Sequence, residues 1–367
     1  MKIARIGLYQ EENELKKERS RVWLCALSVL IMSGCPGCAK TEADPTEKRD
    51  EEYTQDNTLT EDIPESDLGE TGNNGEKDYG EFPEPVLFPE EFAFEYEVWK
   101  NETTQIKTPG GIVYDGESML VCDTGNHCVA RLTTDGEFVE SYGELGSETG
   151  NFVKPTSLVL YKDEIYVLDA GNMRVQVFDK EMQFLREILF EAAPLSNSGK
   201  YVDMAIDGDG TIYIAADSTY REETGLFYIE EGALRRISGE FSGYLAEKGG
   251  VVYAVNAWQF ITSEGGYNKR PGVNQVYEIS RTELKKVCEL PYMYAPMDFI
   301  MGEDEIYTLS TVWGEMNRVS MEGELLEALL LTEELQLHDM YLCMQDENTF
   351  YVADAKGYLY KVFRAGD

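Results

Sequence analysis

The sequence has little histidine, little positive charge and no long apolar run. Its 367 residues include two histidines, His127 and His338, and 32 Lys and Arg against 69 Asp and Glu, a formal net charge of -37. The H-E-x-x-H, G-x-S-x-G and phosphate-cradling glycine motifs are absent, so zinc peptidases, α/β-hydrolases and P-loop enzymes lack their markers here. Without a basic field to neutralise phosphates, we expect no nucleic-acid partner. The acidic balance favours cationic, metal-bearing or neutral partners.

The N-terminus has the layout of an export signal. A basic segment precedes the apolar run VWLCALSVLIM at 22–32, which is too short to span a membrane with confidence and has the length of a signal-peptide h-region. The run ends in M-S-G-C at 32–35, which resembles a bacterial lipobox. This resemblance implies cleavage before Cys35 and a diacylglycerol anchor on its thiol. We therefore predict a lipoprotein signal peptide at 1–34; an ordinary cleaved signal or an N-terminal anchor helix are the alternatives.

The segment that follows is predicted to be a tether. Residues 35–91 are rich in Asp, Glu, Thr, Asn, Gly and Pro, with few apolar neighbours before VLF at 86–88. Such a segment buries too little apolar surface to offset its ordering entropy, so we expect disorder. Repulsion among its acidic residues would extend it into a spacer between lipid and body.

The body, residues 92–367, is built from repeats. The sequence CDTGNHCVARL at 122–132 returns as LDAGNMRVQVF at 168–178, a spacing of 46 residues, and a period of 40 to 50 residues is typical of propeller blades. Each unit reads as four short strands separated by turn residues. The first strands of the six units are GIVYD from 111, SLVLY from 157, DMAID from 203, YLAEK from 244, DFIMG from 298 and DMYLC from 339.

The two best copies resemble NHL repeats, in which a strand ends in Asp-Thr-Gly-Asn and a basic residue follows. The resemblance implies an all-β fold, a six-bladed β-propeller. The last unit ends at YLYKVFRAGD after its third strand, whereas FAFEYEVWK at 92–100 precedes the first unit. We therefore predict that this N-terminal strand completes the sixth blade, because closure leaves only short protected edges.

The repeated Asp-x-Gly-Asn sequences are interpreted as turns between second and third strands. Asp side chains bond nearby backbone N–H groups, and Gly and Asn tolerate positive φ. Asp123, Asp169 and Asp354 are accordingly predicted to be turn formers.

A metal site is one hypothesis for the channel. Asp203, Asp298 and Asp339 begin the first strands of units three, five and six, and first strands line a propeller channel. Converging carboxylates would need a cation or donors, and hard oxygen ligands suit calcium; Asn256 is a fourth candidate ligand. The alternative is that these aspartates cap amides of a neighbouring loop.

A second set of candidates lies on three irregular loops, at 216–225, 256–274 and 310–317. Long loops on a rigid scaffold often carry function. Aromatic side chains there suit stacking on sugars or anchoring a protein partner, or else they pack onto the blades. The ligand-binding candidates are Tyr220, Trp258, Phe260, Tyr267 and Trp313, with 256–274 the main determinant of specificity.

Two cysteines flank one predicted turn. Cys122 and Cys128 would be close enough to pair in an oxidising compartment. Two small buried thiols are the equally favoured alternative.

Together these features favour a monomeric cell-surface lipoprotein whose propeller is a non-catalytic recognition platform for a protein or glycan. The main alternative is an extracytoplasmic calcium-dependent hydrolase, similar to gluconolactonase and regucalcin-like propellers, with a metal that polarises an ester or lactone carbonyl. A sensory or assembly partner of a membrane complex is a third possibility. Fold alone does not choose among them.

Overall fold

The computed structural model describes residues 94–191, 199–218, 224–239, 241–257, 260–261, 267–268, 274–290, 296–310, 315–331 and 340–364. The predicted leader, Cys35 and the acidic tether lie outside these residues. Within the described part, no helix is long and apolar enough to cross a membrane.

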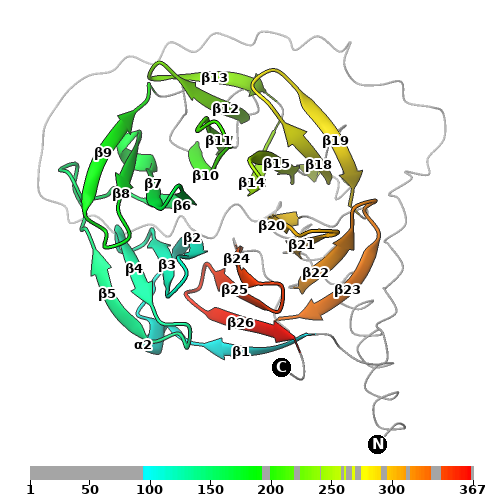
Figure 1. Cartoon of the computed structure of the whole chain (residues 1–367), viewed down its shortest axis with the longest axis horizontal. Coiled ribbons are helices and arrows are strands. Elements are labelled where there is room, and N and C mark those ends of the chain that lie inside the picture. Colours follow the sequence, from blue (N-terminus) through cyan, green and yellow to red (C-terminus); the bar gives the residue numbers. More distant parts are fainter. Residues whose placement is uncertain are drawn as a thin grey trace, which may run out of the picture.

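The described strands form six four-stranded antiparallel sheets, arranged around a central axis as the blades of a β-propeller (Figure 1). This confirms the predicted fold. Blade one contains β2 (Pro109–Tyr114), β3 (Met119–Asp123), β4 (Cys128–Leu132) and β5 (Phe138–Tyr142). Blade two contains β6 (Pro155–Tyr161), β7 (Glu164–Asp169), β8 (Arg174–Phe178) and β9 (Phe184–Leu189). Blade three contains β10 (Lys200–Ile206), β11 (Ile212–Asp217), β12 (Gly225–Glu230) and β13 (Ala233–Ser238).

The other three blades follow the same order from the axis outwards. Blade four contains β14 (Gly243–Lys248), β15 (Val251–Asn256), β18 (Gln275–Ile279) and β19 (Leu284–Glu289). Blade five contains β20 (Pro296–Met301), β21 (Glu305–Ser310), β22 (Glu315–Ser320) and β23 (Leu325–Leu330). Blade six contains β24 (Met340–Asp346), β25 (Thr349–Asp354), β26 (Leu359–Arg364) and β1 (Phe94–Trp99). The short helices α2 (Asn101–Thr104) and η2 (Ala170–Asn172) lie in connections, and β16 (Phe260–Ile261) pairs with β17 (Tyr267–Asn268).

The N-terminal strand closes the ring, as predicted. β1 pairs antiparallel with β26 along its whole length, from Phe94 opposite Arg364 to Trp99 opposite Leu359. Trp99 then packs on the β4–β5 turn of blade one, where Gly136 adopts a φ of 77° and an added Cβ would collide with the indole ring. The closing strand therefore connects blade six to blade one by side-chain packing as well as by sequence.

The hydrophobic core is divided among the interfaces between blades. Each of the six described core clusters combines residues of two neighbouring blades, and the six clusters together complete the circle. The cluster between blades six and one includes Tyr351 and Ile112, and the cluster between blades five and six includes Phe94 and Tyr307. Because each blade buries both faces, successive residues of an inner strand are apolar and point alternately to the two neighbouring blades. In β3, Met119 and Val121 join the cluster shared with blade six, and Leu120 and Cys122 join the cluster shared with blade two.

Candidate functional site

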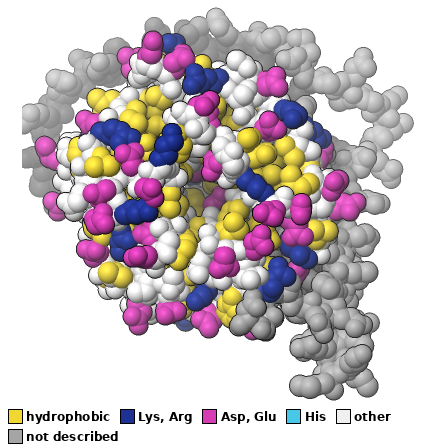
Figure 2. Space-filling model, viewed as in Figure 1, with side chains coloured by type: hydrophobic (Ala, Val, Ile, Leu, Met, Phe, Trp, Pro, Cys, Tyr) yellow, Lys and Arg dark blue, Asp and Glu magenta, His cyan; other side chains and the backbone are white. Residues whose placement is uncertain are grey.

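One face of the propeller, which we call the mouth face, carries two sets of connections. Strands alternate in direction within each blade, so the loops that lead into the first strands share a face with the connections between second and third strands. The first strands lie next to the axis (Figure 1). Acidic side chains are visible within the central hollow of the molecule (Figure 2).

Strand register identifies one equivalent position per blade beside the axis. In blades two, three, four and six it lies opposite the residue two positions after the tyrosine of the second strand, as with Ser157 opposite Leu168 and Asp203 opposite Ala215. In blade one the corresponding pair is Gly111 opposite Cys122. In blade five, Asp298 occupies the irregular step between Pro296 and Phe299. The six residues are Gly111, Ser157, Asp203, Tyr244, Asp298 and Tyr341.

Asp203 joins three blades at this level. Its Oδ1 accepts hydrogen bonds from the Ser157 hydroxyl of blade two at 2.8 Å and from its own strand's Met204 N–H at 2.8 Å. Its Oδ2 accepts a hydrogen bond from the Leu245 N–H of blade four at 2.7 Å. The carboxylate thus satisfies amides of inner strands that have no further sheet neighbour on that side.

Asp298 repeats the arrangement two blades further on. Oδ1 accepts from the N–H of Phe299 at 2.8 Å, and Oδ2 accepts from the N–H of Leu342 in blade six at 2.8 Å. In both places an aspartate of one blade bonds the main chain of the next blade. These contacts match the alternative hypothesis that the aspartates cap main-chain amides. The capped amides belong to a strand of the next blade and not to a loop.

The two carboxyl groups disfavour each other's charge. Burial raises the pKa of Asp203 to about 6, although its hydrogen bonds oppose that shift. Burial and then repulsion from Asp203 raise the pKa of Asp298 well above its usual range. Burial, with a further contribution from Asp298, raises the pKa of the nearby Cys343 thiol. The channel therefore retains protons that exposed carboxyl groups release.

This shift predicts a pH dependence of folding. Between about pH 4, where an unfolded aspartate titrates, and about pH 6, the folded chain holds a proton at Asp203 that the unfolded chain has lost. Stability must then fall as the pH rises through that window, by about 3 kcal/mol for this group. We expect Asp203→Asn to flatten the fall, as measured by urea unfolding at a series of pH values.

The control for that measurement is Asp209→Asn, which removes the same charge from an exposed turn of blade three. It should leave the slope of stability against pH unchanged. Equal slopes for wild type and Asp203→Asn would contradict the assignment of the proton to the channel.

Asp339 was predicted at the channel position of blade six, but the strand register gives that position to Tyr341. Met340 lies opposite Asp354 and Tyr341 opposite Ala353, so Tyr341 is the equivalent of Asp203 in blade six. Asp339 itself lies outside the described residues. The sequence contained a usable signal. In blades two to six the channel position precedes the second-strand tyrosine by nine or ten residues, whereas Asp339 precedes Tyr351 by twelve.

Two tyrosines complete the channel wall on the side of blades four to six. The rings of Tyr244 and Tyr341 meet edge to face with centroids 6.4 Å apart, and the Tyr244 hydroxyl lies 3.8 Å from Sδ of Met297. The channel therefore combines carboxyl, hydroxyl and aromatic groups. No group of three or more His, Cys, Asp or Glu side chains suited to a metal ion occurs among the described residues.

The turn aspartates also anchor the loops at the mouth. Asp123 accepts hydrogen bonds from Asn126 in its own turn and from the N–H groups of Lys107 and Thr108 in the loop that leads into blade one, at 3.1 to 3.2 Å. Asp169 accepts from the N–H of Val153 at 2.7 Å in the corresponding loop of blade two. The predicted structural role is confirmed for these residues, and it extends beyond the turn.

The basic residue of the second repeat belongs to the same structural unit, a role the sequence did not predict. Arg174 is 5% exposed. Its Nε donates to Oδ2 of Asp169 at 2.8 Å, and its Nη2 donates to the carbonyls of Glu148 and Asn151 at 3.0 and 2.9 Å. The arginine therefore holds the loop at 143–154 against the turn.

In blade four the connection between the second and third strands is much longer than in blades one and two. Asp123 pairs with Cys128 and Asp169 with Arg174, so the connection spans 124–127 in blade one and 170–173 in blade two. In blade four Asn256 pairs with Gln275, and the connection spans 257–274. It contains the extra hairpin β16–β17, in which Ile261 pairs with Tyr267.

Of the predicted ligand-binding aromatics, only two belong to described strands. Phe260 is in β16 and Tyr267 in β17. The other three, Tyr220, Trp258 and Trp313, lie outside the described residues. Their role remains a prediction.

The proposed Cys122–Cys128 disulfide is not formed. Both thiols are free and buried. Cys122 lies opposite Val129, whereas Cys128 lies opposite Asp123. Because successive residues of a strand point to opposite faces, the two thiols are on opposite sides of the sheet. The alternative of two buried thiols is confirmed.

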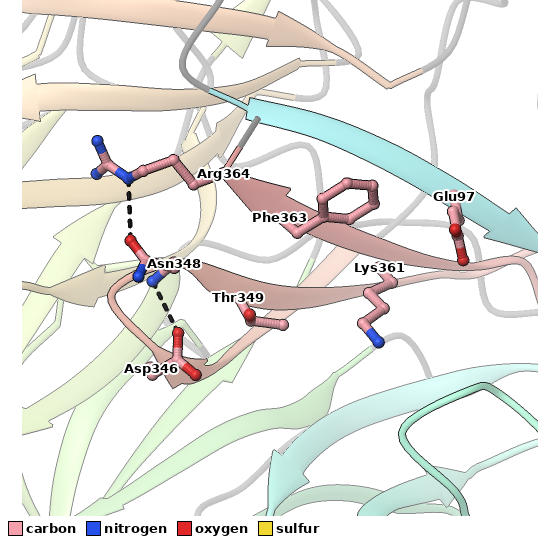
Figure 3. A pocket seen from close by; sticks show the side chains of 7 residues that line it. All are labelled: Glu97, Asp346, Asn348, Thr349, Lys361, Phe363 and Arg364. Atoms are coloured by element: carbon pink, nitrogen blue, oxygen red, sulfur yellow. Dashed lines mark hydrogen bonds between the residues drawn. The ribbon is translucent and has the colours of Figure 1, made fainter. Parts of the chain in front are cut away.

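A surface pocket of about 430 Å³ lies on blade six, away from the mouth face (Figure 3). It is lined by Glu97, Asp346, Asn348, Thr349, Lys361, Phe363 and Arg364. Its two cations already have partners: Arg364 Nε donates to Oδ1 of Asn348 at 3.0 Å, and Lys361 Nζ lies 3.6 Å from Asp135. The Asn348 amide is neutral, so this hydrogen bond orients the guanidinium of Arg364 without neutralising its charge.

Comparison with known proteins supports the fold. No protein-family model and no curated protein matches this chain. Solved propellers do match in three dimensions. Virginiamycin B lyase from Staphylococcus aureus is 14% identical with a TM-score of 0.50, over 74% of this chain and 99% of the lyase. Regucalcin, a calcium-binding protein from Agrobacterium tumefaciens, is 11% identical with a TM-score of 0.51, over 71% and 91% of the two chains.

A third neighbour is the PQQ-bound aldose sugar dehydrogenase from Streptomyces coelicolor, 11% identical with a TM-score of 0.51, over 74% and 98% of the two chains. At such identities the likeness shows the six-bladed β-propeller fold alone. Because several of these neighbours are enzymes, the fold does not support the expectation of a non-enzymatic role, and it assigns no activity.

Proposed function

We propose that this protein is a recognition platform that binds a protein or glycan at its mouth face, outside the cytoplasm. The observation that carries the proposal is the extended connection of blade four, which adds β16–β17 to a scaffold whose blades one and two use short turns there. Irregular loops on a rigid framework are a common site of binding.

The channel contacts favour binding without metal chemistry. Both oxygens of Asp203 and both of Asp298 accept main-chain hydrogen bonds. Raised pKa values at both groups weaken any competition of calcium for these oxygens, since a proton must first leave. The residues thus fit a structural role in holding neighbouring blades in register.

The test replaces residues 257–274 of the full chain with Thr-Gly-Asn-His, the connection of blade one. The exchange is possible because the two connections join equivalent strand ends. Asn256 pairs with Gln275 in blade four, as Asp123 pairs with Cys128 in blade one. We expect unchanged cooperative unfolding and loss of binding on a glycan array or to an isolated protein partner. A folded variant that binds as the wild type does would overturn the proposal.

Membrane attachment is a separate part of the proposal, supported by the lipobox-like M-S-G-C at 32–35. Cells that express the chain should incorporate a labelled fatty acid into it, and Cys35→Ala should abolish that label. Persistence of the label in the variant would place the anchor elsewhere.

A calcium-dependent hydrolase is the second candidate, because Asp203 and Asp298 lie near enough to repel each other in the channel. Should calcium bind there, it would supply a Lewis acid for an ester or lactone carbonyl. Thermal melting with millimolar calcium distinguishes the two candidates, since a ligand of the folded state raises the melting temperature. We expect no rise; a rise in wild type that is absent from Asp203→Asn/Asp298→Asn would favour the hydrolase.

A further inference from the structure

Three apolar side chains are exposed together on the mouth face of blade two. Leu145 is 64% exposed, Leu189 60% and Met173 42%. Leu145 lies in the loop that leads into the blade, Met173 in the β7–β8 connection and Leu189 at the end of β9. We call these three residues the blade-two patch.

Two hydrogen bonds link the chain segments that bear these three residues. The Asn172 side chain donates to the carbonyl of Gly146 at 3.0 Å, which joins the residue before Met173 to the residue after Leu145. The N–H of Phe190, the residue after Leu189, donates to the carbonyl of Met173 at 3.2 Å.

The framework beneath the patch is rigid. Leu189 lies opposite Arg174 in the β8–β9 pair, so both side chains point to the same face of the sheet. On that face the Arg174 guanidinium bonds the carbonyls of Glu148 and Asn151 and fixes the loop that bears Leu145. The apolar surface is thus preformed, which lowers the entropic cost of binding.

The rim of the patch is acidic. Glu144 and Glu148 in the loop and Glu191 after β9 are exposed, and within the described residues none of their carboxylates forms an ion pair. Glu187 is also part-exposed but is already paired with Arg174 at 2.9 Å. Lys154, the cation of the same loop, is exposed, and its main-chain N–H donates to Nδ1 of His127 of blade one at 3.0 Å. The three glutamates outnumber this one lysine.

We propose that the blade-two patch binds a protein segment that presents apolar side chains flanked by Lys or Arg. Contiguous exposed apolar surface with a polar rim marks interaction sites, and unpaired carboxylates around it select a partner of opposite charge. This inference rests on the proposed role as a recognition platform and adds a contact surface two blades away from the blade-four connection.

The experiment uses the purified full chain and three labelled peptides, composed of Leu and Lys, of Leu and Glu, and of Ser and Lys. Fluorescence anisotropy should show that the Leu/Lys peptide binds wild type best. Leu145→Ser/Leu189→Ser should weaken that binding by roughly tenfold or more, because two apolar anchors are lost. The matched control Val98→Ser/Leu326→Ser changes exposed apolar residues of blades six and five and should leave it unchanged.

Three results would overturn the proposal. The Ser/Lys peptide could bind as well as the Leu/Lys peptide, which would attribute binding to the overall charge of -37 alone. The patch variant could bind as wild type does. Wild type could sediment as a dimer and the patch variant as a monomer, which would assign the patch to self-association. Because residues 257–274 are unchanged in these variants, failure here is distinguishable from failure of the proposed function.

Discussion

Phe94→Ala is expected to destabilise the whole propeller by about 3 to 5 kcal/mol, the usual cost of emptying a buried phenylalanine site. Phe94 is 5% exposed, and its ring meets that of Phe350 edge to face with centroids 5.7 Å apart. The Arg364 guanidinium carbon lies 5.1 Å from the centre of the same ring. Since β1 is the outer strand that completes blade six, a weakened anchor there loosens the closure on which every interface between blades depends.

Urea unfolding followed by circular dichroism measures this effect. Tyr96→Ala is the matched control, since Tyr96 belongs to the same strand and is 39% exposed, with its ring centroid 6.0 Å from that of Tyr360. It should cost about 1 kcal/mol. If the two variants lose the same stability, β1 is not an energetic part of the closure.

Arg174→Met should cost about 3 to 5 kcal/mol, because removal of one partner leaves the other charge buried. Asp169 is 0% exposed and would keep only hydrogen bonds from neutral donors, such as the Val153 N–H and the Asn172 amide. Met retains most of the apolar length of Arg, so the loss reports the charge and its hydrogen bonds.

Arg186→Met provides the comparison within the same blade. Arg186 and Glu164 also form a close ion pair, at 2.6 Å, but their side chains are 45% and 29% exposed. Exposed pairs contribute at most about 1 kcal/mol. Chemical denaturation measures the free energy of unfolding of both variants. If both lose the same stability, burial does not explain the contribution of the Arg174–Asp169 pair.

Local patterns in the sequence were sufficient for the architecture. Alternating apolar residues, turn residues and the 46-residue period predicted six blades, and the unmatched strand at 92–100 predicted the closure. These features follow from contacts between residues close in the chain, or repeated at a fixed spacing, and so they can be read without a structure.

The contacts across the axis and between blades required the tertiary structure. Asp203 and Leu245 are 42 residues apart, and Asp298 and Leu342 are 44 apart. One or two residues gained or lost in a turn shift which side chain reaches the axis, which is why Tyr341 rather than Asp339 occupies that position in blade six. Side-chain direction likewise separated Cys122 from Cys128, although the two are close in sequence.

By itself, then, the sequence determined that this chain forms a six-bladed propeller closed by its N-terminal strand, because strand periodicity and turn chemistry are local. Only the tertiary structure decided that the aspartates of the channel bond neighbouring blades, that Arg174 holds a loop, and that Leu145, Met173 and Leu189 share one surface. Those outcomes depend on how separate blades stack, and stacking is set by packing between residues far apart in the chain.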